Sequence, residues 1–189
     1  MIHISIEGMD GVGKTTTCKL LAEKLGYQFI EKPLHYLFDK SENDFDEYLR
    51  IRDQVNANPN RNFTSWFYGL GSLYMYETFK DKSIITDRHL ASNYAWSGSD
   101  YNKDVYDLLV KKLGAPKLTV IIYSPSEVIV QRLFSRDKED KDIARAKQSE
   151  IIYKRMIEFC EEYKFPYIVI DTSKLKPEEV VSKILEELK

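Results

Sequence analysis

A glycine-rich segment near the N-terminus most constrains the fold of this chain. It runs Gly8-Met9-Asp10-Gly11-Val12-Gly13-Lys14-Thr15 and satisfies the pattern G-x-x-x-x-G-K-[ST]. A β-type apolar run, residues 2–6, precedes it, and an apolar stripe with helical spacing follows it. Glycines let the backbone curl so that its N–H groups and the N-terminus of the next helix point at anionic oxygens. The segment therefore predicts a phosphate-binding loop between a strand and a helix.

The polar residues of this loop have expected roles. Lys14 should reach the β and γ phosphates of a bound nucleotide, and the Thr15 hydroxyl should ligate Mg²⁺. ATP and Mg²⁺ are therefore the expected cofactors. The expected ATP-binding residues are Gly8, Met9, Asp10, Gly11, Val12, Gly13, Lys14, Thr15 and Thr16.

Short β-type runs alternate with helical patterns along the whole chain. This alternation predicts one α/β domain over residues 1–189, with three layers and a parallel sheet covered by helices on both faces. The strands are expected at 2–6, 27–30, 83–86, 118–123 and 167–170. Helices are expected after the phosphate loop up to Gly26, at about 42–57, 64–80, 103–113 and 145–163, and from about Pro177.

One further helix start is predicted from Ser124-Pro125-Ser126-Glu127. Here Ser124 would be the N-cap, a proline would occupy the first turn, and Glu127 would complete a capping box. The helix that follows should carry Arg132.

The composition is that of an ordinary globular protein. It is 43% hydrophobic and 31% charged, and 28 Lys and Arg are set against 30 Asp and Glu. This balance disfavours a partner that is a nucleic acid polymer. No apolar run approaches the roughly 18 residues that cross a membrane. Cys18 and Cys160 lie far apart at apolar helical positions, as expected for reduced thiols in a cytoplasmic protein.

Two charged residues, Asp87 and Arg88, directly follow the predicted strand at 83–86. The C-terminal ends of parallel strands gather at one edge of the sheet, so both side chains should lie near the phosphate loop. An aspartate there can hold Mg²⁺ or its waters, and an arginine can grip a phosphate with two hydrogen bonds. We expect Asp87 and Thr15 at the metal; a surface ion pair between Asp87 and Arg88 is the alternative.

Two segments resemble motifs of the thymidylate kinase family. Residues 7–16, Glu-Gly-Met-Asp-Gly-Val-Gly-Lys-Thr-Thr, are similar to its phosphate loop. Residues 87–96, Asp-Arg-His-Leu-Ala-Ser-Asn-Tyr-Ala-Trp, are similar to its D-R-[YH]-x-x-S-x-x-A-[YF] element. The order of elements agrees over nearly the whole chain. The resemblance implies a P-loop nucleoside monophosphate kinase with strand order 2-3-1-4-5, a small-molecule nucleotide acceptor and a homodimer.

The resemblance also implies roles on the acceptor side. Asp10 would face the sugar 3′-hydroxyl and the magnesium shell, and Arg88 would hold the acceptor phosphate. Asn93 falls on a position that can contact the base, and Ser92 belongs to the same element. Trp96 would crowd the 2′ side of the sugar and so favour deoxyribose, unless its ring only packs in the core.

A mobile cation is expected from a lid over about 132–145. Family members without an arginine at the position of Gly11 supply that charge from the lid. A closing lid can bring an arginine to the transferring phosphoryl group as water is excluded. Arg136, with Arg132 as support, is the expected source, although a solvated helix end would also explain Arg136. The expected catalytic residues are Asp10, Lys14, Arg88, Arg132 and Arg136.

The chain departs from the family at three positions. The resemblance places the base-stacking residue at Tyr68 and the base-reading arginine at Ser72, and serine cannot replace a guanidinium fork. The second strand ends in Glu31 and Lys32, whereas thymidylate kinases commonly have arginine and glutamate there. Related deoxynucleoside kinases carry a glutamate at this edge that takes the proton of the sugar 5′-hydroxyl.

Three functions are therefore open from the sequence. The first is Mg-ATP-dependent phosphorylation of a deoxynucleoside monophosphate, dTMP or a related pyrimidine nucleotide by resemblance. The second is a deoxynucleoside kinase with Glu31 as the base. The third is a P-loop protein that binds a nucleotide without turnover.

Overall fold

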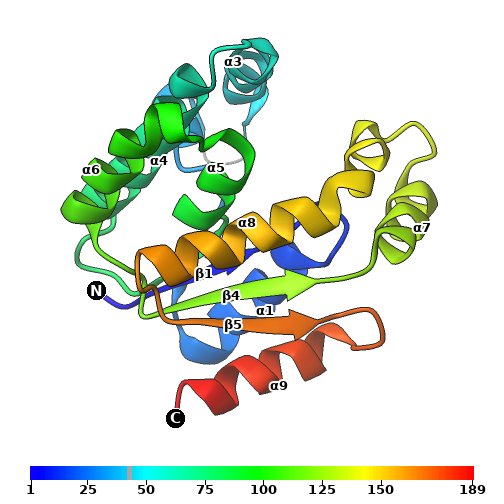
Figure 1. The fold of residues 1–189 in the computed structure, drawn as a ribbon. Coiled ribbons are helices and arrows are strands. Elements are labelled where there is room, and N and C mark those ends of the chain that lie inside the picture. The colour runs from blue at the N-terminus through cyan, green and yellow to red at the C-terminus, as the bar shows by residue number, and fades with distance from the viewer. Residues whose placement is uncertain (42–43) are drawn as a thin grey trace.

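The computed structural model describes residues 1–41 and 44–189 (Figure 1). The described residues form a five-stranded parallel sheet in the order β2-β3-β1-β4-β5. The strands are β1 (His3–Glu7), β2 (Gln28–Ile30), β3 (Ile84–Asp87), β4 (Leu118–Tyr123) and β5 (Tyr167–Asp171). The predicted α/β class, strand positions and strand order are confirmed.

Helices cover both faces of the sheet. In Figure 1, α8 crosses one face while α1 and α9 pack together on the other. α5 packs on α8 and on α4, so helices α3 to α6 form a separate layer above one end of the sheet. The helices are α1 (Lys14–Leu25), α2 (His35–Phe38), α3 (Asp46–Ala57), α4 (Arg61–Thr78), α5 (Leu90–Ser97), α6 (Lys103–Leu113), α7 (Ser126–Arg136), α8 (Ser149–Glu162) and α9 (Pro177–Glu187).

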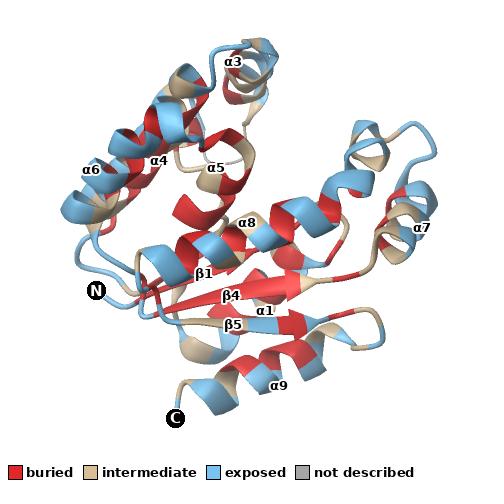
Figure 2. Cartoon of the chain, in the orientation of Figure 1, coloured by how far each residue is buried: buried red, intermediate tan, exposed pale blue. Residues whose placement is uncertain are grey.

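The core lies on both faces of the central strands. All residues of β1 are buried, as are all but the last of β4 (Figure 2). Burial on both faces explains why these strands are continuous apolar runs instead of alternating ones. The buried sheet is a rigid platform for the loops at its C-terminal edge.

The predicted cap at Ser124 is wrong. The helix α7 begins at Ser126 with Pro125 in the N-cap position. Ser124 is buried, and its Oγ lies 2.9 Å from Thr172 Oγ1. The serine is committed to this tertiary contact after β5, so it is not available to cap the helix.

Helix boundaries differ from the predictions in several places. Helix α4 begins at Arg61, because Asn60 caps it by accepting from Asn62 N at 3.1 Å. The predicted start of a helix at residues 42–43 lies outside the described residues, and α3 begins at Asp46. The predicted pattern at 145–163 is a 3₁₀ turn, Arg145–Gln148, followed by α8. Helices α2 and α5 were not predicted.

Cys18 and Cys160 are both buried and not in a disulfide. Within residues 1–41 and 44–189, no helix has the length and apolar character needed to cross a membrane.

Candidate active site

The candidate site lies at the C-terminal edge of the sheet, where β1 and β3 end side by side. Ile6 is in register with Asp87, so the phosphate loop after β1 and the Asp87-Arg88 pair after β3 adjoin. On the other side of β3, Ile30 is in register with Thr86, which places Glu31 at the same edge. The strand order thus gathers three segments that are far apart in the sequence.

The phosphate loop has the backbone that its glycines allow. Gly8, Gly11 and Gly13 have φ angles of 147°, 83° and 95°, in the left-handed region that disfavours other residues. A Cβ at Gly8 would lie 2.5 Å from Ile122 O, so the loop fits closely against β4. Gly13 is the N-cap of α1 and has no side chain to cap the first amides, which leaves them available for anionic oxygens.

One carboxylate joins the two cations of the site. Lys14 Nζ donates to Asp10 Oδ1 at 3.3 Å and to Met9 O at 2.8 Å, and Arg88 Nη2 donates to Asp10 Oδ2 at 2.8 Å. Burial alone would raise the pKa of Asp10, but the charges of Arg88 and Lys14 outweigh it and hold that pKa well below its usual range. Asp10 is therefore ionised, and it connects the phosphate loop to the residues that follow β3.

Thr15 and Asp87 place two oxygens side by side that could hold Mg²⁺. Thr15 Oγ1 donates to Asp87 Oδ2 at 2.6 Å, beside the phosphate loop. Among the described residues, no three His, Cys, Asp or Glu side chains converge on a possible metal site. That small donor set suits Mg²⁺, which usually keeps waters and binds one or two protein oxygens together with substrate phosphates.

Ser92 and Asn93 of the second motif are both buried and bonded to protein groups. Ser92 is buried, and its amide and hydroxyl both donate to Glu7 Oε2. Asn93 Nδ2 donates to Ser65 O at 3.0 Å, and Asn93 Oδ1 accepts from Tyr106 at 3.2 Å. The Asn93 amide is therefore bonded to protein groups, and its contact with a base stays a prediction.

Trp96 packs at the edge of the main hydrophobic core. The guanidinium of Arg145 lies over its ring, 5.9 Å from the ring centroid. This contact connects α5 to the end of the lid.

The expected base-binding wall is formed by α3 and α4. Tyr68 donates to Asn56 Oδ1 at 3.1 Å, and Ser72 donates to Tyr68 O at 3.3 Å within α4. Burial raises the pKa of Tyr68, and its hydrogen bond with Asn56 and the charge of Arg52 partly oppose that rise.

Glu31 lies at the sheet edge but is paired. Lys32 Nζ forms an ion pair with Glu31 Oε1, and both side chains are mostly buried. Burial lowers the pKa of Lys32, while the charges of Asp87 and Asp10 partly oppose this effect. The Glu31-Lys32 pair thus lies beside the Asp87 and Arg88 end of β3.

The segment expected to be a lid packs against the phosphate loop through α7. A Cβ at Gly11 would lie 2.9 Å from Leu133 Cγ, so α7 contacts the loop directly. Arg132 donates to Thr172 O at 2.7 Å and to Ser124 Oγ at 3.2 Å, which fastens it to the segment after β5. Arg136 is 63% exposed and pairs with Asp140 inside the lid.

Burial and the negative charge of Asp10 raise the pKa of Asp142 in the expected lid. The roles of Arg132 and Arg136 in phosphoryl transfer stay predictions.

Two arginines near the candidate site, Arg52 and Arg145, were not predicted as site residues. Arg52 Nη2 donates to Asp53 at 2.6 Å, and Arg145 Nη1 donates to Asp142 at 3.2 Å. Neither belongs to a recognisable motif: Arg52 lies between Ile51 and Asp53, and Arg145 lies between two alanines. The one available signal was position: Arg52 lies four residues after Tyr48, and Arg145 is the last residue of the expected lid.

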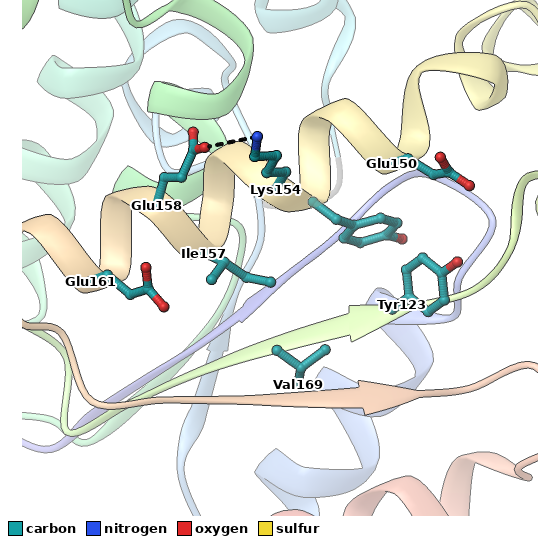
Figure 3. A pocket seen from close by; sticks show the side chains of 8 residues that line it. Tyr123, Glu150, Lys154, Ile157, Glu158, Glu161 and Val169 are labelled. Carbon is teal, nitrogen blue, oxygen red and sulfur yellow. Dashed lines mark ion pairs between the residues drawn. The ribbon is translucent and has the colours of Figure 1, made fainter.

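A separate groove runs between α8 and the strands β4 and β5 (Figure 3). It has a volume of about 550 Å³ and an apolar floor that includes Tyr123 and Val169. Lys154 and Glu158 on α8 pair across one wall at 3.6 Å. No residue predicted for the site lines this groove.

Comparisons with known proteins agree with this geometry. The sequence model of the family described as "Thymidylate kinase" matches residues 6–184. A probable thymidylate kinase of Methanocaldococcus jannaschii is 30% identical, with 100% of this chain and 96% of the relative covered. A putative adenylate kinase of Thermococcus gammatolerans is also 30% identical, over 97% of this chain and 83% of the relative.

A solved structure shares the fold at low sequence identity. The deoxyadenosine kinase from M. mycoides superposes with a TM-score of 0.66 and 18% identity, covering 99% of this chain and 98% of that one. The motifs, the strand order and the match over residues 6–184 lead to one conclusion: the chain belongs to the thymidylate kinase family and is a nucleoside monophosphate kinase.

Proposed function

We propose that this enzyme transfers the γ-phosphoryl group of Mg-ATP to a deoxynucleoside monophosphate, dTMP or a related pyrimidine nucleotide. The contact of Asp10 with both Lys14 and Arg88 carries the proposal. Lys14 belongs to the phosphate loop, which would bind ATP, and Arg88 follows β3, where it would hold the acceptor phosphate. Their common partner, Asp10, brings these two cations close together. Direct transfer between two bound phosphates needs this proximity.

The cations at the site support a phosphorylated acceptor over a free nucleoside. Arg88 lies at the site in an ion pair with Asp10, and a guanidinium is a good match for a phosphate dianion. The Glu31 carboxylate forms an ion pair with Lys32. A carboxylate that is already paired is less suited to abstract a proton from a sugar hydroxyl.

The transfer itself needs positioning and no base on the enzyme. An oxygen of the acceptor phosphate bonds to the γ-phosphorus of ATP as the bond to the β–γ bridging oxygen breaks, and ADP leaves. Mg²⁺ held near Thr15 and Asp87 would neutralise charge on the donor phosphates. Lys14 would bind those phosphates, and Arg136 would add positive charge from the lid. Arg132 would keep the lid in place through its bonds to Thr172.

The base preference rests on fewer contacts. Ser72 cannot supply the two parallel hydrogen bonds of an arginine, and the names of the relatives include both a thymidylate and an adenylate kinase. Trp96 stands at the edge of the core near Arg145, where it would crowd a 2′-hydroxyl and favour deoxyribose.

A homodimer through α4 is part of the proposal. This helix has an exposed apolar stripe with helical spacing, and a self-complementary stripe suits a two-fold interface. Its residues are Phe63, Trp66, Leu70 and Leu73, each between 45% and 51% exposed. The buried free thiols of Cys18 and Cys160 are compatible with the expected cytoplasmic location.

A coupled assay of ADP release tests the proposal. It would use Mg-ATP with the deoxy and ribo forms of the common nucleosides and of their monophosphates. We expect turnover with monophosphates, the deoxy forms favoured, and little turnover with nucleosides. ATP binding without ADP release for any acceptor would support the non-catalytic alternative instead.

Glu31 at the sheet edge keeps the deoxynucleoside kinase as a second candidate. Glu31→Gln should leave the use of monophosphates within about tenfold of wild type, since no base is required. Glu23→Gln, an exposed change on α1, is the matched control. Turnover of nucleosides that is lost in Glu31→Gln and kept in Glu23→Gln would overturn the monophosphate proposal.

A further inference from the structure

Glu7 is a buried carboxylate at the end of β1, directly before the phosphate loop. Its exposed fraction is 0%, and a buried charge is tolerated only with close hydrogen-bond partners. Oε2 accepts from the Ser92 hydroxyl and from the amides of His89 and Ser92, both at 3.2 Å. All three donors belong to the segment that follows Arg88.

Arg88 needs such support because its backbone is strained. Its φ is 78°, in the left-handed region that is costly for a residue with a Cβ. Such conformations persist only where the surroundings hold them. The Arg88 amide donates to Ile6 O at 2.9 Å on one side, and Glu7 holds the next residue, His89, on the other.

Glu7 also takes the place of a cap for α5. His89 is the N-cap of this helix and makes no capping bond with its own side chain to any described residue. The Ser92 amide in the first turn would otherwise lack an acceptor, and a carboxylate at a helix N-terminus is favourable. One oxygen of Glu7 therefore fixes both the turn and the helix that follow Arg88.

The phosphate loop has its own anchors. Met9 N donates to Tyr153 Oη at 3.3 Å, and Thr172 Oγ1 donates to Val12 O at 3.2 Å. Loss of the bonds to Glu7 should therefore loosen the segment after β3 more than the phosphate loop.

We propose that Glu7 is a positioning residue that holds the turn of Arg88, so that the Arg88 guanidinium stays beside Asp10 to receive the acceptor phosphate. This inference rests on the proposed function, which gives Arg88 the acceptor phosphate. Glu7 should therefore affect how well the enzyme uses the acceptor, and it should not affect the binding of ATP.

Steady-state kinetics of Glu7→Gln test this role. The variant keeps the size of the side chain and loses its charge. We expect kcat/KM for the acceptor to fall on the order of a hundredfold, the effect of a small misplacement of a positioning group, with KM for ATP within about threefold of wild type. Equal losses for ATP and acceptor, or no loss, would overturn the proposal.

The matched control is Thr119→Val on β4. Thr119 is fully buried and accepts a hydrogen bond from Ser5 at 3.3 Å, so its loss also removes a buried polar contact. This variant should keep wild-type kinetics even if its melting temperature falls. A comparable loss of acceptor use in Thr119→Val would show that the effect of Glu7→Gln is only general destabilisation.

Hydrogen exchange without substrates gives a readout that is independent of activity. In Glu7→Gln the peptide at residues 88–97 should exchange on the order of tenfold faster, and the peptide at 8–17 should be unchanged. Equal exchange in both peptides would contradict the role of Glu7. If the wild-type protein phosphorylates no acceptor, the proposed function fails while this exchange experiment still tests the link from Glu7 to the Arg88 turn.

Discussion

Acid should destabilise this protein through the buried histidine His89. Its side chain is 6% exposed, and neither ring nitrogen has a hydrogen-bond partner in the described part of the chain. The rings of His3 and Tyr76 face it, with centroids 4.8 Å and 5.6 Å away. Burial lowers the pKa of His89 to about 3. In the unfolded chain the pKa of a histidine is about 6.5.

The sign and size of the effect follow from proton linkage. Between the two pKa values the unfolded chain binds a proton that the folded protein does not, so stability is present above pH 6.5 and is lost as the pH falls. For a folded pKa of about 3, His89 lowers the free energy of unfolding by about 2 kcal/mol between pH 8 and pH 5. Burial also lowers the pKa of His3, which adds a loss of the same sign.

Urea unfolding of His89→Phe at the two pH values measures this contribution. The variant keeps an aromatic ring against His3 and removes the titrating group. Its free energy of unfolding should fall by about 2 kcal/mol less than that of wild type between pH 8 and pH 5. Burial raises the pKa of Glu7, which acts with the opposite sign, but this contribution is present in both proteins and cancels.

Phe79→Leu is the control for the loss of packing near this cluster. Phe79 is 6% exposed and does not titrate, so its stability loss should be the same at both pH values. The reasoning is refuted if His89→Phe keeps the full pH dependence of wild type, because His89 would then not be the group that takes up the proton.

Three further variants test the site and the interface. Arg88→Ala should reduce kcat/KM for the acceptor by about 10²–10³, with ATP affinity by calorimetry nearly unchanged; equal losses would count against its role. Gly8→Ala should lower stability by several times the roughly 1 kcal/mol expected for Gly26→Ala, because its Cβ would meet Ile122 O at 2.5 Å whereas Gly26 has open space. Similar melting temperatures for the two variants would contradict this. Leu70→Glu should yield a monomer in analytical ultracentrifugation, and a persistent dimer would exclude the stripe on α4.

Local patterns were sufficient for much of the fold. The five β-type runs and the glycine loop are short-range signals, because burial of a strand or curling of a loop restricts the residues within that segment. Gly26 was predicted as a helix stop, and it adopts φ 66° at the end of α1. The positions of Lys14 and Thr15 on the strand-to-helix turn were likewise readable from spacing alone.

The segments that escaped prediction lack such a local signal. Helix α5 has eight residues, and most of them are buried because α4 and α8 pack on different sides of it. It therefore shows no polar face and no clear helical period. Ser124 has the composition of a cap, yet a partner after β5, Thr172, takes its hydroxyl.

The sequence by itself determined the class of fold, the phosphate loop and the presence of Asp87 and Arg88 at a strand end. Only the tertiary structure decided which of these groups share a partner. Asp10 and Arg88 are 78 residues apart, and Glu7 and Ser92 are 85 apart. The order of strands β1 and β3 and their register bring them together, and no local periodicity encodes a pairing across that distance.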